Sequence, residues 1–294
     1  MIEAREDIWR ANGLAHHVLT WDGGGAPIVL CHGFLDIAWS WRDVARELAA
    51  AGRRVVAFDW RGHGESEWIG AGGYYHFPDY VRDLEEIVRR IVGAADARAP
   101  IDLVGHSMGG SVCAMYSGAF PEHVRRLVLV EGLGPPEQEL SGAPDRVRAW
   151  SRGLDDARSK PRRPMASTAQ VLSRMRLQNP DVPEALGTLL AEKSTRAAPD
   201  GIGRVWRFDP LHKTMSPMPF VKPAFLAFTS RITAKTLLVN GSRGFRTPDD
   251  DERVRTLRDA RRVWIEGAGH MVHWTHASAL ATAVLEHVTG TEDA

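Results

Sequence analysis

The sequence predicts an α/β protein with a mostly parallel, eight-stranded sheet flanked by helices. Short β-branched runs alternate with longer segments of helical periodicity, which is the pattern of parallel strands covered on both faces. At 294 residues the chain is long enough to bury a substantial core. The alternation breaks once, after residue 131, and this break predicts an inserted subdomain.

Apolar runs rich in Val, Ile and Leu indicate the strands. Seven of them lie at residues 15–21, 27–31, 54–59, 101–104, 126–131, 235–240 and 261–265. An eighth, at residues 8–10, is expected to pair with the first across the turn-forming tripeptide Ala11-Asn12-Gly13. Helical spacing of apolar residues predicts helices at residues 41–51, 77–92, 111–120, 250–258 and 277–288.

The inserted segment lies between the strands that end at Glu131 and begin at Lys235. It has about a hundred residues, too many for a structureless loop in a compact domain. Helices are expected there at residues 144–154, 167–178, 183–195 and 225–231. We therefore divide the chain into a core domain, residues 1–134 and 233–294, and a helical cap, residues 135–232, inserted between strands six and seven. Such a cap would cover the carboxyl edge of the sheet, where α/β proteins bind their ligands.

The composition favours small molecules over nucleic acid as binding partners. Lys plus Arg and Asp plus Glu each number 37, with no long block of one sign, so nothing favours nucleic acid. The N-terminus is charged where a signal peptide would be apolar, and no apolar run is long enough to span a membrane. We expect a cytoplasmic protein, a monomer or homodimer, that binds small molecules. Cys31 and Cys113 lie in predicted core elements and indicate neither a disulfide nor a metal site.

The pentapeptide Gly105-His106-Ser107-Met108-Gly109 follows a predicted buried strand and precedes a predicted helix. This is the G-x-S-x-G pattern of a nucleophile elbow in its expected context. The sharp strand-to-helix turn exposes a serine hydroxyl, which needs a neighbouring base to become nucleophilic. The sequence therefore predicts Ser107 as a catalytic nucleophile.

Four segments together resemble one family. They are CHGF at residues 31–34, FDWRGHGES at residues 58–66, GHSMG at residues 105–109 and GAGH at residues 267–270. The chain resembles the α/β-hydrolases, in which such segments occur in this order. Residues 130–136 and 204–210 are similar to the serine hydrolase-like, esterase-type group of that family. The resemblance implies the α/β-hydrolase fold and a catalytic triad in the chain order Ser, acid, His.

Two backbone amides are expected to form an oxyanion hole. The turn at His32-Gly33 would aim the N–H of Phe34 into the site, and Met108, the residue after the nucleophile, would supply the second N–H. Residues 59–66 are expected to form a structural turn, with no catalytic role for Arg61 or His63.

The substrate pocket is expected to be lined by His32, Trp206 and His273. Large apolar side chains in the cap favour an apolar acyl chain or an aromatic group as the bound part of the substrate. These side chains are Met165, Met175, Met215, Met218, Trp150, Trp206, Phe220, Phe225 and Phe228.

The catalytic base is predicted to be His270, which follows the last strand in a Gly-Ala-Gly loop. His273 and His276 follow at three-residue steps, so the cluster resembles a metal site. Without a carboxylate motif or an H-E-x-x-H helix the zinc signal is weak, and we expect neither a metal nor a cofactor.

The acid departs from the common family pattern. Most relatives place an aspartate three residues after a glycine that follows the seventh strand, but here that position holds Gly244. Two alternatives remain: one of Asp249, Asp250 and Asp251, or Glu131 at the end of the sixth strand, a position some relatives use. We favour Glu131, because a buried carboxylate needs a donor such as a histidine N–H and the three aspartates suit a helix start.

These residues predict a serine hydrolase that cleaves a carboxylic ester through an acyl-enzyme, as a carboxylesterase does. A serine nucleophile argues against the alkyl-enzyme chemistry of haloalkane dehalogenases and epoxide hydrolases, which need a carboxylate. The same triad also serves C–C bond, lactone or amide hydrolysis and acyl transfer. A receptor that binds its ligand on a hydrolase scaffold is the alternative from another class.

Overall fold

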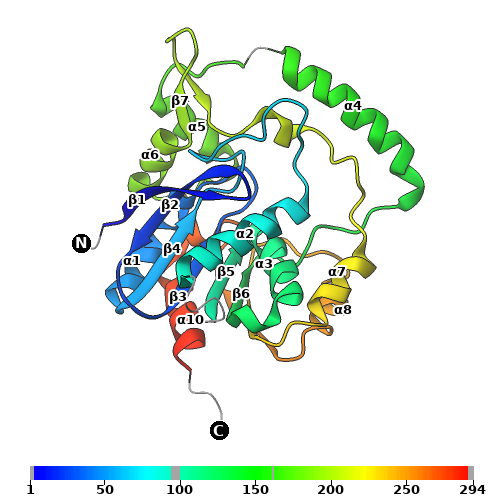
Figure 1. The fold of residues 1–294 in the computed structure, drawn as a ribbon. Helices are drawn as coiled ribbons and strands as arrows, with labels where there is room; N and C mark the ends of the chain where they lie inside the picture. The colour runs from blue at the N-terminus through cyan, green and yellow to red at the C-terminus, as the bar shows by residue number, and fades with distance from the viewer. Residues whose placement is uncertain (1–2, 94–99, 161, 291–294) are drawn as a thin grey trace.

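The protein is described by a computed structural model that covers residues 3–93, 100–160 and 162–290. Its centre is an eight-stranded sheet with the strand order β1-β2-β4-β3-β5-β6-β9-β10 (Figure 1). β1 and β2 pair antiparallel, as do β2 and β4, and the other neighbours are parallel. The predicted fold class is therefore confirmed. The strands are β1 (Arg5–Ala11), β2 (Leu14–Trp21), β3 (Gly24–Cys31), β4 (Arg53–Phe58), β5 (Ile101–His106), β6 (Val124–Val130), β9 (Lys235–Gly241) and β10 (Ala260–Ile265).

The first hairpin is tighter than the sequence predicts. Ala11 pairs with Leu14, which leaves a two-residue turn. Asn12 and Gly13 both have positive φ, 49° and 80°. That conformation matches the right-handed twist of the strands, and Asn-Gly adopts it at low cost. β1 consequently extends over the whole of Arg5–Ala11.

Helices cover both faces of the sheet and give it two hydrophobic cores. α1 (Arg42–Ala50) and α10 (Ala277–Thr289) cover one face, where Trp21 and Trp41 are fully buried. α2 (Phe77–Val92), α3 (Met108–Ala119) and α7 (Lys222–Thr229) cover the other face, where Trp60 and Tyr116 are fully buried. Burial on both faces explains why the central strands read as continuous apolar runs.

The segment between β6 and β9 forms a cluster of its own. It contains α4 (Ala143–Ser159), α5 (Thr168–Gln178), α6 (Glu184–Lys193) and a short hairpin of β7 (Thr195–Ala197) and β8 (Arg204–Trp206). Apolar residues of α5 and α6 pack together with Ile37 and Trp274 of the core. α4 buries no residue, and Figure 1 shows it on the outside, away from the sheet.

Several element boundaries differ from the prediction. α3 begins at Met108 instead of residue 111, because the chain enters the helix directly after Ser107. α8 (Asp250–Val254) ends before residue 258, and its C-terminal cap leads into a turn. The three-residue strands β7 and β8 and the short helix α9 (Val272–Thr275) have no sequence periodicity that would predict them.

The division into a core, residues 1–134 and 233–294, and a cap, residues 135–232, stays a proposal. Residues 1–2, 94–99, 161 and 291–294 of these ranges lie outside the described residues. In the described part of the chain, no helix has the length and apolar composition needed to cross a membrane.

Candidate active site

Ser107 lies at the corner between β5 and α3. Its backbone has φ 51° and ψ −118°, an uncommon and strained conformation for a residue with a side chain. The corner is held because the Ser107 N–H donates to the Val130 carbonyl at 3.0 Å and the Ser107 carbonyl accepts from the Ser111 N–H at 3.1 Å. The turn thus presents the hydroxyl at the carboxyl edge of the sheet, as a nucleophile elbow requires.

His270 approaches Ser107 from the loop after β10. The Ser107 hydroxyl donates to Nε2 of His270 at 3.0 Å. The His270 side chain is 40 % exposed, so the ring can exchange protons with a substrate or with water. The structure therefore brings the predicted nucleophile and base within hydrogen-bond distance.

Glu131 completes this chain of contacts. It follows the last residue of β6 with φ 52°, and its carboxylate is fully buried. Nδ1–H of His270 donates to Oε2 at 3.3 Å. This hydrogen bond leaves the lone pair on Nε2, facing the Ser107 hydroxyl. The structure thus brings all three predicted triad residues together.

Amides from the last two residues of β9 and from the loop that follows it hold the Glu131 carboxylate. Oε1 accepts from the Gly241 N–H at 2.8 Å and from Nδ2 of Asn240 at 3.2 Å, and Oε2 accepts from the Phe245 N–H at 2.8 Å. These donors offset the cost of burying the charge. Sequence reasoning missed them.

Gly244 is part of the same arrangement. A Cβ at this position would collide with the carboxylate of Glu131. The glycine at position 244 was therefore the sequence signal that could have indicated Glu131 as the acid. The space that an aspartate side chain would occupy there is filled by the Glu131 carboxylate.

The three alternative aspartates lie at the start of α8 and bind arginines. Asp249 pairs with Arg253 at 3.0 Å, and Asp251 with Arg246 at 2.6 Å. Asp250 pairs with Arg246 at 2.9 Å and also with Arg262. The ion pair with Arg253 and a hydrogen bond from Thr247 outweigh burial and lower the pKa of Asp249 to about 2. None of the three contacts His270, and their position at a helix start agrees with the structural interpretation.

The two amides predicted for the oxyanion hole are available as donors. Met108 is the first residue of α3, so its N–H lies at the positive end of the helix dipole. Phe34 lies in the turn after β3, with its side chain 49 % exposed. Within the described residues, neither N–H donates to a protein acceptor.

Two of the three predicted pocket residues do not line a pocket. His32 is fully buried, with Nδ1–H donating to the Gly33 carbonyl at 2.7 Å and Nε2 accepting from the Trp60 N–H at 3.0 Å. His273 is also fully buried and donates to Asp36. The predictions for His32 and His273 are wrong because both rings are used inside the core. Trp206 is half-buried in β8 and its role in the pocket stays a prediction.

The apolar cap residues have several different surroundings. Met165 and Phe225 are buried packing residues, Met165 in the cluster of α5 and α6 and Phe225 on α7 in the core that α2, α3 and α7 cover. Met215 and Met218 are exposed. The set as a whole therefore does not form one continuous pocket wall.

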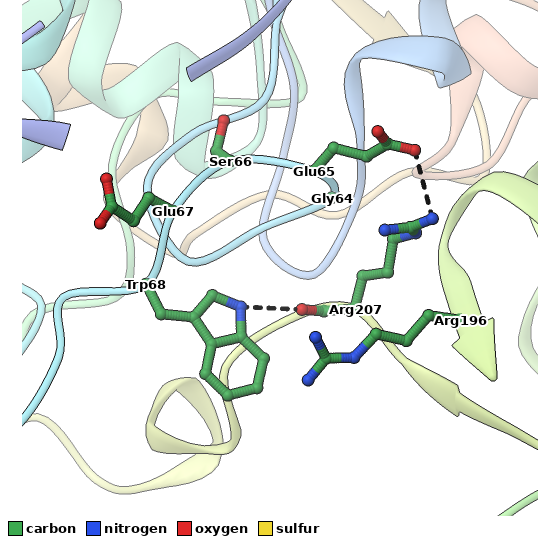
Figure 2. A pocket seen from close by; sticks show the side chains of 7 residues that line it. All are labelled: Gly64, Glu65, Ser66, Glu67, Trp68, Arg196 and Arg207. Carbon is green, nitrogen blue, oxygen red and sulfur yellow. Dashed lines mark hydrogen bonds and ion pairs between the residues drawn. The ribbon is translucent and has the colours of Figure 1, made fainter. Parts of the chain in front are cut away.

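A separate cavity lies at the junction of the core and the inserted segment. It has a volume of about 250 Å³, and its lining residues are Gly64, Glu65, Ser66, Glu67, Trp68, Arg196 and Arg207. Figure 2 shows the loop of residues 64–68 facing the two arginines. Arg207 pairs with Glu65 at 3.2 Å, and the Trp68 indole N–H donates to the Arg207 carbonyl at 3.0 Å. Neither Ser107 nor His270 lines this cavity, so it is not the expected substrate pocket.

Of the three histidines in the cluster that the sequence suggested, only His273 belongs to the group of possible metal ligands in the structure. In the described part of the chain, one group places its ligand atoms within 4.8 Å of one another, and it consists of Asp36, His106 and His273. His270 and His276 are not part of it. Hydrogen bonds occupy Asp36 Oδ2 and Nε2 of His106, as described below.

Comparison with known proteins decides the family. The model of the alpha/beta hydrolase fold matches residues 26–277, which is most of the chain. The chain belongs to the α/β-hydrolase family. This membership confirms the resemblance on which the Ser-acid-His order rests.

Among relatives of this α/β-hydrolase is a serine hydrolase-like protein of Danio rerio, 27 % identical over 97 % of this chain and 84 % of that one. A probable serine hydrolase of Drosophila melanogaster is 27 % identical over 88 % of this chain and 80 % of that one. Among solved structures, a thioesterase domain from the curacin biosynthetic pathway is 28 % identical, with a TM-score of 0.86, covering 96 % of this chain and 99 % of that one.

Proposed function

We propose that this α/β-hydrolase is a serine hydrolase that cleaves carboxylic esters through an acyl-enzyme. The observation that carries the proposal is the continuous series of contacts from Ser107 through His270 to Glu131. The similarity to serine hydrolase-like proteins supports the same conclusion.

In the proposed mechanism His270 removes the proton of Ser107 as the hydroxyl oxygen attacks the ester carbonyl. The amides of Phe34 and Met108 stabilise the oxyanion of the tetrahedral intermediate. His270 then protonates the leaving alcohol, and water repeats the sequence on the acyl-enzyme. Glu131 orients the imidazole and stabilises its charged form without taking the proton.

For the substrate we propose an ester with an apolar acyl chain or an aromatic group. A thioester is a second candidate, because the similar solved structure is a thioesterase domain. The triad chemistry is the same for both, since each reaction passes through an acyl-enzyme. The inserted segment, residues 135–232, would then act as a cap over the site.

A fluorophosphonate probe tests the nucleophile. The wild-type protein should be labelled and the Ser107→Ala variant should not. Ser111→Ala is the matched control, because Ser111 lies one helical turn further along α3 and is buried, at 4 % exposure. Failure to label the wild type, or labelling that persists in Ser107→Ala, would contradict the proposal and favour a ligand-binding protein.

A series of p-nitrophenyl esters of increasing acyl length, with the corresponding N-acetylcysteamine thioesters, tests the substrate class. We expect kcat/KM to rise with acyl length until the pocket is filled. A higher kcat/KM for every thioester than for the ester of the same acyl group would favour the second candidate.

A further inference from the structure

His106, the residue before Ser107, contacts the loop that carries the proposed base. Its ring is buried, and Nε2–H donates to the backbone carbonyl of His270 at 2.9 Å. A carbonyl can only accept, so the proton lies on Nε2. Burial and the neighbouring His273 and His270 keep the pKa of His106 well below its ordinary value, so the ring is neutral with one N–H.

His273 lies three residues after His270, in α9, and makes a second buried hydrogen bond. Its Nε2–H donates to Oδ2 of Asp36 at 3.0 Å. The His273 ring packs against that of His106, with centroids 4.3 Å apart, and against that of Trp41 at 4.5 Å. Burial lowers the pKa of His273 well below its ordinary value, so this ring is neutral too.

Asp36 connects this pair of histidines to the turn that carries the Phe34 amide. Its N–H donates to the Gly33 carbonyl at 3.3 Å, and its Oδ2 also accepts from the Ser40 hydroxyl at 2.8 Å. Burial raises the pKa of Asp36 to about 6, which still leaves an ionised acceptor at neutral pH.

The packing leaves little room for these groups to move. A Cβ added at Gly33 would lie 2.7 Å from Nδ1 of His106 and 3.2 Å from Cβ of Ser107, so the Phe34 turn lies directly on the elbow. Ile37 and Trp274, the next residues after Asp36 and His273, pack in the cluster formed by α5 and α6. One buried unit therefore joins the nucleophile, the base loop, the oxyanion turn and the inserted segment.

We propose that His106, His273 and Asp36 are positioning residues that fix the distance between Ser107 and His270. Two hydrogen bonds do this, one from His106 Nε2 to the His270 carbonyl and one from His273 to Asp36. This inference rests on the proposed function, because it assigns these residues to the same reaction. None of the three touches the substrate. Their contribution is to hold the loop of His270 at the elbow, where a misplacement of about 1 Å costs about a hundredfold in rate.

Paired substitutions of His106 test the donor bond. The amide nitrogen of glutamine can occupy the position of Nε2, whereas that of asparagine matches Nδ1 and cannot reach the carbonyl. We expect His106→Asn to lower kcat about 30- to 100-fold with KM changed less than about threefold. His106→Gln should retain kcat within about fivefold of wild type. Labelling by the fluorophosphonate probe should slow in the same proportion as kcat.

His287→Asn is the matched control. His287 is also buried, at 8 % exposure, and its Nε2–H donates to a backbone carbonyl, that of Lys235, at 3.0 Å. It lies in α10 beside the amino end of β9, away from the site. Its substitution should leave kcat within about twofold. Equal kcat in His106→Asn and His287→Asn, or equal losses in His106→Asn and His106→Gln, would overturn the inference.

Two further measurements separate this inference from the proposed function. If the wild-type protein neither hydrolyses the esters nor reacts with the fluorophosphonate probe, the proposed function itself is rejected. The exchangeable Nδ1 proton of His270, assigned in the proton NMR spectrum by its loss in Glu131→Gln, reports the position of the loop without any substrate. It should shift in His106→Asn and stay in place in His287→Asn, and the opposite result would reject the positioning role. If His106→Asn does not fold by circular dichroism, His273→Asn and His273→Gln provide the same comparison at the Asp36 bond.

Discussion

Two histidine–carboxylate pairs among the described residues, His270 with Glu131 and His17 with Asp59, share the same local geometry although they lie in different regions. Both carboxylates are buried, and both accept hydrogen bonds from backbone amides. In both pairs Nδ1 of the histidine faces the carboxylate, at 3.3 Å for Glu131 and 2.9 Å for Asp59. By local chemistry alone, either pair could belong to a catalytic triad.

The second ring nitrogen makes the difference. Nε2 of His270 faces the Ser107 hydroxyl, and the side chain is 40 % exposed. Nε2 of His17 faces a second carboxylate, Glu6, at 3.0 Å, and its side chain is 3 % exposed. A histidine between two carboxylates is held in its charged form and stabilises the fold, whereas one between a carboxylate and a hydroxyl can act as a base.

The largest effect is expected at the catalytic pair. Glu131→Gln keeps the shape of the side chain but removes the charge that orients His270, so kcat should fall about 10³- to 10⁴-fold. Steady-state hydrolysis of a p-nitrophenyl ester measures it. Asp250→Asn is the control, because that carboxylate binds arginines instead, and kcat should change less than about threefold. Loss of turnover in Asp250→Asn alone would show that the acid is not Glu131.

Substitution in the His17–Asp59 pair should lower the stability of the fold. Asp59→Asn leaves the charged His17 without its main buried partner, so the free energy of unfolding should decrease by about 3–5 kcal/mol. The fraction that folds should keep kcat within about fivefold. Urea unfolding and active-site titration measure the two quantities separately. A loss of kcat larger than the loss at Glu131 would remove the distinction between the two pairs.

Moving the acid to the loop after β9 sharpens the comparison. The Glu131 carboxylate occupies the space beside Gly244. In the single variant Gly244→Asp the new side chain should therefore clash with this carboxylate and lower both stability and kcat. In the Glu131→Gly background the clash is absent, and adding Gly244→Asp should raise kcat about tenfold over Glu131→Gly alone. A matched double variant, Glu131→Gly with Gly244→Asn, carries no charge and should show no such gain.

The smallest effect concerns pH and stability. Burial favours the neutral ring, but the hydrogen bond and charge of Asp59 and the hydrogen bond of Glu6 outweigh it and raise the pKa of His17 to about 9. The stability from this raised pKa is complete below the unfolded pKa of about 6.5 and is lost as the pH rises through about 9. The melting temperature of wild type should exceed that of His17→Gln most below pH 6.5, and the difference should shrink by pH 9.5. A constant difference across this range would contradict the charged state of His17.

The sequence predicted the central strands of the sheet because each is a contiguous apolar run buried on both faces, whereas the edge strand β1 is largely exposed and only its residues 8–10 were predicted. The hairpin β7–β8 could not be predicted in this way, since three residues are too few to show a period. The proposed nucleophile and base could be named for a similar reason: Ser107 and His270 occur in short motifs whose local turns expose the side chain. His32 and His273 carried the same kind of signal, yet their rings are buried and hydrogen-bonded.

What the sequence determined by itself was therefore local: the apolar runs of the central strands, the elbow at Ser107 and the late histidine. Only the tertiary structure decided which carboxylate meets His270, because Glu131 is far in the chain from Gly241 and Phe245, and these contacts depend on β6 and β9 being neighbours. The same holds for the difference between His270 and His17. The role of a ring nitrogen depends on the group opposite it, and for Nε2 of His270 that group is Ser107, which only the packing of segments far apart in the chain brings there.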